Sequence, residues 1–265
     1  MSPSPNIAIF SDLDGCLLNK HDYSFEAARP TLDRIRDSKI PLILASSKTV
    51  VEMRRIAAEM QLDDAPLICE NGGAIFWTNR ENADPERTVL GIDRSKILEV
   101  LSSLKATYNF DSFRDLGVAG VMKATDLSET KAEAALARAS TEPLVWQDEA
   151  NRIEEFGRKL SDHGLTLTRG GRFWHVAGAT TKGTAMQRVI DRLYKSMTSP
   201  PTTLAIGDSP IDQTMLDIAD VPIGIPWPNG VVHVTVKGHN GVTASLAGAD
   251  GWAEAVTKVL DSLTS

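Results

Sequence analysis

The chain has few cysteines, few aromatic residues and no long apolar segment. Its 265 residues include only two cysteines, Cys16 and Cys69, which excludes a disulfide framework and provides no metal-ligand spacing, so we interpret both as reduced thiols. No apolar run approaches the ~20 residues that cross a membrane. Residues 1–10 also lack the basic segment and the long apolar stretch of a signal sequence. These absences predict a cytoplasmic protein with no membrane partner.

Positive charge is also scarce. Lysine and arginine number 28 against 35 aspartates and glutamates, which gives a formal net charge of −7 at pH 7. No block of basic residues interleaved with aromatic residues occurs, so we expect no nucleic-acid partner. An acidic protein that binds an anionic substrate must gather cations, or a metal ion, locally at the site. The sequence should therefore contain such a cluster.

The chain does contain a recurring pattern of short apolar runs that end in polar turns and pass into helical periodicity. Continuous apolar runs of this length are typical of strands buried on both faces of a parallel sheet. Thr49 and Glu52 form a capping box at the start of one such helix. Open α/β sheets bind ligands at the carboxyl ends of their strands, where these polar turns would lie. We predict an α/β fold with strands over residues 7–10, 41–45, 67–69 and 203–206.

The middle of the chain differs from its two ends. It has a loop-rich opening, then helix-like stretches at 95–106, 131–139 and 151–163, with short extended pieces such as 143–146. A length of 265 residues also exceeds that of a usual single domain. We predict a discontinuous catalytic core over 1–78 and 176–265, with an inserted α+β domain over 79–175.

Four acidic residues follow two of the predicted strands. Asp12 and Asp14 come directly after the first strand, and Asp208 and Asp212 follow the strand over 203–206. Two carboxylates so close together need a cation or a shared proton, although Asp, Ser and Gly also favour ordinary turns. Oxygen ligands from several carboxylates are what Mg²⁺ prefers. A pair of acidic strand ends in one parallel sheet favours a Mg²⁺ site.

Polar and basic residues at two helix starts complete the candidate cluster. Lys182 begins an amphipathic helix, where a cation opposes the helix dipole and so is expected to serve another purpose. An ammonium beside the carboxylates could neutralise a phosphoryl group in transfer, whereas an isolated lysine is more often a solvated surface residue. Ser46, Ser47 and Lys48 precede another helix and could form an anion seat, or could serve only as a helix start that Thr49 caps.

The order of these motifs resembles that of the haloacid dehalogenase-like (HAD) phosphatases. It runs Asp12-x-Asp14-Gly15, then Ser46, then Lys182, then Gly207-Asp208-x-x-x-Asp212. The resemblance implies a HAD-like Rossmannoid parallel-sheet core, and the predicted insertion resembles the C2-type cap of that superfamily. Cys16 stands where the family usually has threonine, and Ile211 where it usually has asparagine; neither change removes a proposed ligand.

A closer resemblance is to the mannosyl-3-phosphoglycerate phosphatase family, and it runs over nearly the whole chain. It rests on five segments, two of them in the predicted core, two in the insertion and one near the C-terminus: 46–49, 70–76, 138–143, 169–175 and 251–256. It implies a phosphoric monoester hydrolase that acts on a small phosphorylated sugar-glycerate and releases mannosylglycerate, a compatible solute.

The resemblance also implies a role for each motif residue. Asp12 would attack phosphorus to give an aspartyl-phosphate, and Asp14 would act as the general acid and base. Mg²⁺ would be held by the Asp12 side chain, the Asp14 carbonyl and Asp208, with Asp212 in support. Ser46 would hydrogen-bond a phosphoryl oxygen, and Lys182 would balance the remaining charge.

The substrate would carry a carboxylate and a sugar, so further cations and hydrogen-bonding groups are needed. Guanidinium groups pair with carboxylates through two hydrogen bonds, although a single arginine is often only part of a surface ion pair. The substrate-binding candidates are Ser47, Lys48, Glu70, Asn71, Gly72, Arg138, Ser140, Thr141, Arg169 and Arg172.

Three alternatives stay open from the sequence. Glucosyl-3-phosphoglycerate differs from the mannosyl compound in the configuration of one hydroxyl, a difference that one or two unplaced hydrogen bonds decide. A phosphomutase would share the motif at Asp12 but return the phosphate to its substrate. A non-catalytic sugar-phosphate-binding module is disfavoured, because Asp12, Asp14, Lys182 and Asp208 occur together. The sequence does not determine the oligomeric state.

Overall fold

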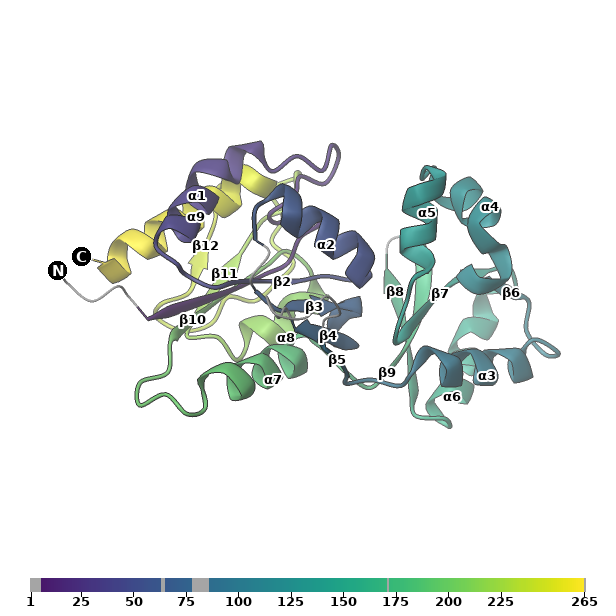
Figure 1. The fold of residues 1–265 in the computed structure, drawn as a ribbon. Coiled ribbons are helices and arrows are strands. Elements are labelled where there is room, and N and C mark those ends of the chain that lie inside the picture. The colour runs from purple at the N-terminus through teal and green to yellow at the C-terminus, as the bar shows by residue number, and fades with distance from the viewer. Residues whose placement is uncertain (1–5, 63–64, 78–85, 171, 265) are drawn as a thin grey trace.

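The computed structural model describes residues 6–62, 65–77, 86–170 and 172–264, and it contains two separate sheets (Figure 1). The larger sheet has eight strands in the order β12-β11-β10-β1-β2-β3-β4-β5. Its strands are β1 (Ile7–Ser11), β2 (Leu42–Ala45), β3 (Leu67–Cys69), β4 (Ala74–Trp77), β5 (Glu86–Val89), β10 (Thr202–Gly207), β11 (Val221–Gly224) and β12 (Val242–Thr243).

The central strands are parallel and buried on both faces, which confirms the α/β prediction. Strand β1 pairs in parallel with β10 on one side and β2 on the other. Every residue of β1 is buried, and its side chains alternate, since Ile7 and Ile9 join one apolar cluster while Ala8 and Phe10 join another. The four strands predicted from apolar runs are all present, within one or two residues at their ends.

Helices cover both faces of the larger sheet (Figure 1). On one face lie α1 (Arg29–Asp37), α2 (Val50–Glu59) and α9 (Gly248–Thr264), and on the other lie α7 (Lys182–Tyr194) and the short α8 (Gln213–Leu216). The predicted capping box at α2 is present, because the Thr49 side chain accepts from the Glu52 N–H and the Glu52 carboxylate accepts from the Thr49 N–H.

The smaller sheet has four antiparallel strands in the order β6-β7-β9-β8. An apolar cluster that includes Tyr108, Phe110 and Phe156 packs α3 and α6 against it. Two further helices, α4 and α5, contact each other, and α5 also contacts α2 of the larger unit. The elements are β6 (Phe110–Ser112), β7 (Thr141–Trp146), β8 (Leu165–Gly170), β9 (Phe173–Gly178), α3 (Arg94–Leu104), α4 (Phe113–Thr125), α5 (Glu129–Leu136) and α6 (Ile153–Ser161).

Sequence periodicity predicted three of these four helices and missed α4. The helix starts at a capping box in which Ser112 and Asp115 satisfy each other's backbone N–H groups. Gly117 inside α4 has a non-helical backbone with φ of +59°. The glycine also interrupts the regular apolar spacing by which a helix is identified from sequence.

The strand β5 belongs to the larger sheet, where it pairs antiparallel with β4. Residues 86–89, which the predicted division assigns to the insertion, are thus joined to the eight-stranded sheet. Two connections, residues 90–93 and 179–181, lead from that sheet to the smaller unit and back. The predicted start of the insertion, residue 79, lies outside the described residues, and the division into two domains stays a proposal.

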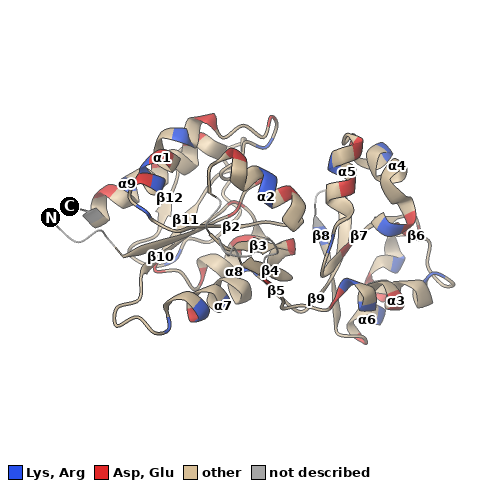
Figure 2. Ribbon diagram, in the orientation of Figure 1, with Lys and Arg blue, Asp and Glu red and all other residues tan. Residues whose placement is uncertain are grey.

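Charged residues of both signs alternate along the helices of both units (Figure 2). In the part of the chain that the structure describes, we find no helix that is both long and apolar enough to cross a membrane.

A half-buried histidine on β9 predicts acid sensitivity of the smaller unit. Burial, followed by the positive charge of Arg138, lowers the pKa of His175 to about 4. The unfolded chain, with an ordinary histidine pKa near 6.5, therefore binds a proton more readily than the folded chain between these values. Stability is full above about pH 6.5 and is lost as the pH falls toward 4, by on the order of 2 kcal/mol.

We expect His175→Gln to flatten the pH dependence of the free energy of unfolding between pH 6.5 and 4, measured by urea denaturation. The exposed His163 at the end of α6 offers a matched control, since His163→Gln should leave the wild-type dependence in place. An unaltered slope in His175→Gln would contradict this assignment.

Candidate active site

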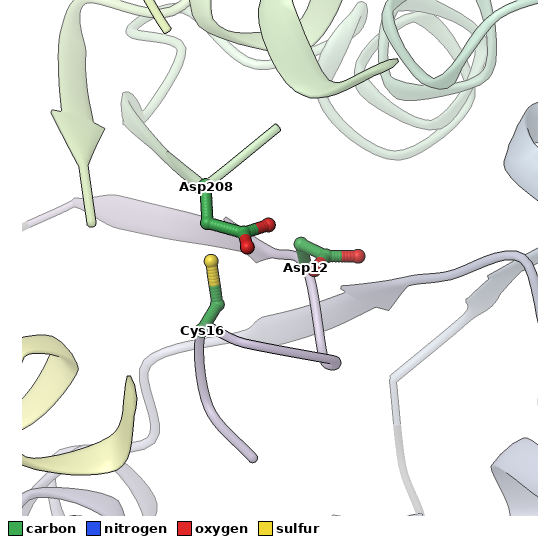
Figure 3. Close-up of side chains that lie close together, drawn as sticks. All are labelled: Asp12, Cys16 and Asp208. Atoms are coloured by element: carbon green, nitrogen blue, oxygen red, sulfur yellow. The ribbon is translucent and has the colours of Figure 1, made fainter. Parts of the chain in front are cut away.

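The predicted acidic cluster forms at the carboxyl ends of two adjacent strands. Asp12 follows β1 and Asp208 follows β10, and their backbones are in register, since the Asp12 N–H donates to the Ile206 carbonyl at 3.0 Å. Both side chains are buried, with exposed fractions of 6% and 3%. Figure 3 shows the two carboxylates close together, with the Cys16 sulfur pointing toward Asp208. The sheet topology therefore brings together residues almost 200 positions apart.

Lys182 lies inside this cluster. Thr181 caps α7 by accepting from the Thr184 N–H, and this places Lys182 at the first helical position with only 2% of its surface exposed. Its ammonium donates to the Asp12 carboxylate and, at 2.6 Å, to Asp212. Burial lowers the pKa of Lys182, but the charges of Asp12 and Asp212 outweigh burial and raise it above its ordinary value. The lysine is thus a permanently charged part of the site.

Asp212 holds the loop after β10 in place. One of its oxygens accepts from Lys182, and the other accepts from the backbone N–H groups of Asp208 and Ser209 and from the Ser209 hydroxyl, at 2.9–3.1 Å. Both oxygens are therefore engaged by protein donors. This arrangement favours support of Asp208 and Lys182 over direct metal binding, a role that stays a prediction.

The site carries more negative charge than its lysine balances. Burial raises the pKa of Asp12 well above its ordinary value; Lys182 opposes this effect, while Asp212, Asp14 and Asp208 add to it. Burial and then the Asp212 charge raise the pKa of Asp208 to about 6. A cation between the two carboxylates would relieve both effects.

The donor atoms fit a hard divalent cation. Ligand atoms of Asp12, Cys16 and Asp208 all lie within 4.8 Å of one another. Carboxylate oxygens suit Mg²⁺, whereas a thiol is a soft ligand, and burial raises the pKa of Cys16 well above its ordinary value. The two carboxylates are therefore the side-chain ligands that we expect for Mg²⁺, with Cys16 a protonated neighbour.

Gly15 is required by this geometry. Its φ is +88°, and a Cβ atom there would lie 2.5 Å from Oδ2 of Asp208. We expect Gly15→Ala to displace the Asp208 carboxylate, weaken metal binding and destabilise the fold by about 1–2 kcal/mol. Calorimetric Mg²⁺ titration and thermal unfolding measure the two effects.

At Gly230, φ is +80° and nothing lies within 4 Å of such a Cβ, so Gly230→Ala is a control for backbone strain alone. Equal Mg²⁺ affinities in the two variants would contradict the expectation.

Asp14 and Lys48 form an ion pair that sequence spacing did not suggest. The Lys48 ammonium donates to both Asp14 oxygens, at 2.7 and 2.6 Å, and both side chains are partly exposed. Burial lowers the pKa of Lys48, but the Asp14 charge and hydrogen bonds, with smaller effects of Glu52 and Tyr23, raise it overall. The pair brings the loop after β2 against the loop after β1.

Ser46 directly follows β2, close to the Asp14–Lys48 pair, and it is fully buried. Its N–H donates to the Ile68 carbonyl at 2.9 Å, and its hydroxyl accepts weakly from the Lys48 N–H at 3.3 Å. The neighbouring Ser47 contributes its carbonyl to a long contact of 3.4 Å with Arg138. The residues that follow the carboxyl ends of β1, β2 and β10 therefore lie close together, as the order of the strands predicts.

The other substrate-binding candidates fall into two groups. Glu70, Asn71, Gly72, Arg138, Ser140 and Thr141 lie together where the two units meet. Arg169 and Arg172 lie elsewhere, on and after β8. The Arg169 guanidinium lies 5.1 Å from the centre of the Trp174 ring. Arg172 is exposed and donates to the Thr125 carbonyl at 3.1 Å.

Arg172 lines a cleft of about 950 Å³ between the two units. Core residues Leu18, Tyr23 and Lys48 line its opposite side, together with α2, and α5 contributes Lys131 and Ala134. The cleft thus reaches from Lys48, which pairs with Asp14, to the smaller unit. It is the space in which the part of a substrate beyond its phosphate could lie.

Three residues that support the backbone at Asp12 and Asp208 were not predicted from the sequence as part of the site. The Trp227 indole N–H donates to the Asp208 carbonyl at 3.1 Å, and the Lys20 ammonium lies 3.5 Å from the centre of the Trp227 ring. The buried Trp252 donates to the Ser11 hydroxyl at 2.9 Å, and that hydroxyl donates to the Asp12 carbonyl at 2.7 Å. Trp227 follows another buried strand, β11, and Trp252 lies in the segment 251–256 that carries part of the resemblance, whereas Lys20 has no such sequence signal.

Comparison with known proteins decides the family. The family model described as haloacid dehalogenase-like hydrolase matches residues 9–226, which include every motif residue of the cluster. The chain belongs to the haloacid dehalogenase-like hydrolases. The resemblance drawn from the motifs and the predicted HAD-like fold are both confirmed.

A relative from Persephonella marina is 35% identical over 97% of this chain and 98% of its own length, and it is named glucosyl-3-phosphoglycerate/mannosyl-3-phosphoglycerate phosphatase. The predicted enzyme class, a phosphoric monoester hydrolase, agrees with both findings.

Two solved structures show the same fold over nearly the whole chain. A haloacid dehalogenase-like hydrolase from Bacteroides thetaiotaomicron has a TM-score of 0.67 at 19% identity and covers 95% of this chain and 98% of its own. A haloacid dehalogenase-like hydrolase from B. subtilis has a TM-score of 0.62 at 18% identity, with coverage of 96% and 98%. Both the larger and the smaller unit are therefore part of an established HAD architecture.

Proposed function

We propose that this HAD hydrolase is a Mg²⁺-dependent phosphatase that hydrolyses mannosyl-3-phosphoglycerate, with glucosyl-3-phosphoglycerate as the alternative or second substrate. The observation that carries the proposal is the identity of 35% to the Persephonella marina phosphatase, because it extends over 97% of this chain and so includes the smaller unit. The acidic cluster and its buried lysine support phosphoryl transfer independently. The product would be mannosylglycerate, a compatible solute.

In the proposed reaction an oxygen of the Asp12 carboxylate attacks phosphorus and the bond from phosphorus to the glycerate oxygen breaks. Asp14 gives a proton to the leaving alkoxide. Asp14 then takes a proton from water, the water oxygen attacks the aspartyl-phosphate, and Asp12 is regenerated with release of phosphate. Asp14 would therefore enter the first step as the carboxylic acid and the second as the carboxylate. Lys48, which donates to both Asp14 oxygens in the structure, would hold the side chain in place.

Electrostatic support comes from fixed groups. Lys182 keeps Asp12 beside a permanent positive charge and would neutralise part of the charge on the phosphoryl oxygens. The Asp12 and Asp208 carboxylates and the Asp14 carbonyl would hold Mg²⁺, which when bound neutralises phosphoryl oxygens and orients them for attack. Ser46, directly after β2, would hydrogen-bond the phosphoryl group.

We further propose that the part of the predicted insertion 79–175 that follows β5, together with the rest of β9 (residues 90–178), forms the substrate-recognition cap over this core. The lining of the cleft between the units includes four acidic side chains, Glu52, Glu59, Asp126 and Glu133, and four basic ones, Lys48 and Arg55 from the core and Lys131 and Arg172 from the region 90–178. The basic groups suit a substrate that carries a carboxylate as well as a phosphate. Closure of the cap would exclude water during the first transfer.

Phosphate release from the two phosphoglycerates, measured side by side with and without Mg²⁺, tests the proposal. We expect Mg²⁺-dependent release from at least the mannosyl compound, loss of release in EDTA, and recovery when Mg²⁺ is restored. A product in which the phosphate has been returned to the substrate molecule, in place of free phosphate, would indicate a mutase. Release that is unaffected by EDTA, or absence of release from both compounds, would contradict the proposal.

A further inference from the structure

The loop over residues 70–73, here called the junction loop, meets three separate segments of the chain that belong to or lead to the smaller unit. The Gly73 carbonyl accepts from the N–H groups of Leu90 and Gly91 in the first connection. The Gly72 carbonyl accepts from the Thr180 hydroxyl in the second connection at 2.9 Å. The third segment is 139–141, at the start of β7. The junction loop is thus the place where the larger unit holds both connections and the smaller unit itself.

The Glu70 carboxylate makes the contact with the third segment. It is 1% exposed, and it accepts from the Ala139 N–H at 2.7 Å, the Ser140 N–H at 3.1 Å and the Thr141 hydroxyl at 2.5 Å. Three donors from consecutive residues converge on a single buried carboxylate. This side chain from the larger unit therefore satisfies buried donors at the start of a strand of the smaller unit.

The backbone of the junction loop is adapted to this contact. Glu70 and Asn71 both have positive φ, +55° and +56°, although neither is glycine. A Cβ atom at Gly73 would lie 2.1 Å from the Ser140 hydroxyl oxygen, and one at Gly72 would lie 2.1 Å from the Thr181 carbonyl oxygen. Two adjacent left-handed residues are costly, and such a conformation persists only where the surroundings impose it.

The junction loop is also bonded to the catalytic side. The Glu70 N–H donates to the Lys48 carbonyl at 3.0 Å, and the Asn71 N–H donates to the Ser46 carbonyl at 2.9 Å. Lys48 in turn holds Asp14. A continuous series of hydrogen bonds therefore runs from segment 139–141 of the smaller unit to the Asp14 carboxylate.

Arg138 is the side chain that this arrangement places at the site. Its guanidinium donates to the Thr141 hydroxyl at 2.8 Å and to the Ser47 carbonyl at 3.4 Å. Its Nε–H group is buried and has no hydrogen-bond partner among the described residues. A partly exposed guanidinium whose Nε–H group is buried and unused, beside the loop over 46–48, is suited to an anionic group of a ligand.

We propose that Glu70 is a positioning residue, which docks segment 139–141 against the larger unit and thereby sets Arg138 and the pair Lys48–Asp14 in their places relative to each other. It acts through these residues and does not bind the substrate itself. The predicted substrate contact of Glu70 is thus replaced by a role behind the site. The part of the proposal that concerns Arg138 and the substrate rests on the proposed function; the docking contact does not.

Glu70→Gln tests the proposal, because it keeps the size of the side chain but replaces one acceptor oxygen with a donor that faces N–H groups. We expect hydrogen exchange at the amides of Ala139 and Ser140 to accelerate at least tenfold. We also expect kcat/KM for the phosphoglycerate substrate to fall ten- to one-hundredfold, and hydrolysis of p-nitrophenyl phosphate, which does not need Arg138, to fall less. Thr141→Val removes one of the three donors to Glu70 and also the oxygen that accepts from Arg138, and it should shift both readouts in the same direction, even if Glu70→Gln folds poorly.

Glu142→Gln is the matched control. Glu142 is as deeply buried as Glu70 and lies next to Thr141, but it accepts from Arg94 and from the Arg114 N–H, both in the region 90–178. We expect it to lower the stability of the smaller unit while leaving the ratio of the two activities at its wild-type value. A change in that ratio only in Glu70→Gln and Thr141→Val distinguishes positioning from general support of the fold.

Three outcomes would overturn the proposal. Wild-type exchange at Ala139 and Ser140 in Glu70→Gln would show that the carboxylate does not hold them. Faster exchange with wild-type kinetics on both substrates would show that the contact does not position the site. Equal losses in Glu70→Gln and Glu142→Gln would reduce Glu70 to a structural residue. If the wild-type enzyme hydrolyses neither phosphoglycerate, the proposed function fails, and the exchange and p-nitrophenyl phosphate data still decide the docking contact.

Discussion

Asp12→Asn is expected to abolish phosphatase turnover while the protein stays folded. The amide cannot attack phosphorus as a carboxylate does, so the first transfer is lost, and kcat should fall by about 10⁴-fold or more, the scale seen when a nucleophile is removed. Asp12 is buried directly after β1. Asparagine has nearly the same size and shape as aspartate, so it should fit the same space. Phosphate release under saturating substrate and Mg²⁺ measures the loss.

The folded state of Asp12→Asn should be close to wild type in stability. Burial already raises the pKa of Asp12, which means that the ionised form is costly to bury, and a neutral amide avoids that cost. The loss of the ion pair with Lys182 acts in the opposite direction, although the amide oxygen can still accept a hydrogen bond, and Lys182 keeps Asp212 as a partner. Asp37→Asn, at an exposed position of α1, is the control for the substitution itself. Substantial turnover by Asp12→Asn would remove the nucleophile assignment.

Lys182→Met should damage both stability and activity. The ammonium lies between Asp12 and Asp212, so its removal leaves two buried carboxylates without their shared cation. Breaking a buried ion pair from one side costs about 3–5 kcal/mol. Loss of the positive charge beside the phosphoryl group should lower kcat by a further 10²–10³-fold, the approximate effect of removing one fixed stabilising group. Urea unfolding and phosphate release measure these separately.

A second lysine provides the comparison for that variant. Lys237 also forms an ion pair, with Asp217 at 3.1 Å, but its side chain is largely exposed. Exposed ion pairs contribute little, so Lys237→Met should keep both the stability and the turnover of the wild-type enzyme. If Lys182→Met were as stable and as active as Lys237→Met, the charge of Lys182 would contribute neither to stability nor to turnover, and the prediction would be wrong.

The convergence of Asp12, Asp14, Ser46 and Asp208 could be predicted because it depends only on strand order. Apolar runs identify parallel strands, and the residues after them must meet at one edge of the sheet. Lys182 could be found for a related reason, since Thr181 marks a helix start at which a lysine has no local use. These predictions used short-range patterns that a single sequence contains.

Other features could not be predicted in the same way. Lys48 reaches Asp14 only because β1 and β2 are adjacent and α2 begins where it does, and no spacing in the chain indicates this pair. Glu70 was recognisable as a candidate from its motif, but its three donors lie about 70 residues away in the smaller unit. Helix α4 was missed because Gly117 breaks its periodicity. Long-range packing decided the contacts of Lys48 and Glu70, and a local break in the backbone decided the third feature.

The most direct test of the central claim is to identify the phosphorylated residue. The enzyme would be quenched during turnover, the acyl phosphate reduced with borohydride, and the peptide that contains residues 12–16 sequenced by mass spectrometry. An aspartyl-phosphate at Asp12 predicts homoserine at position 12, dependent on substrate and absent from Asp12→Asn. Reduction at Asp14 or Asp208 instead, or turnover with no reducible carboxylate in any of the three, would contradict the account.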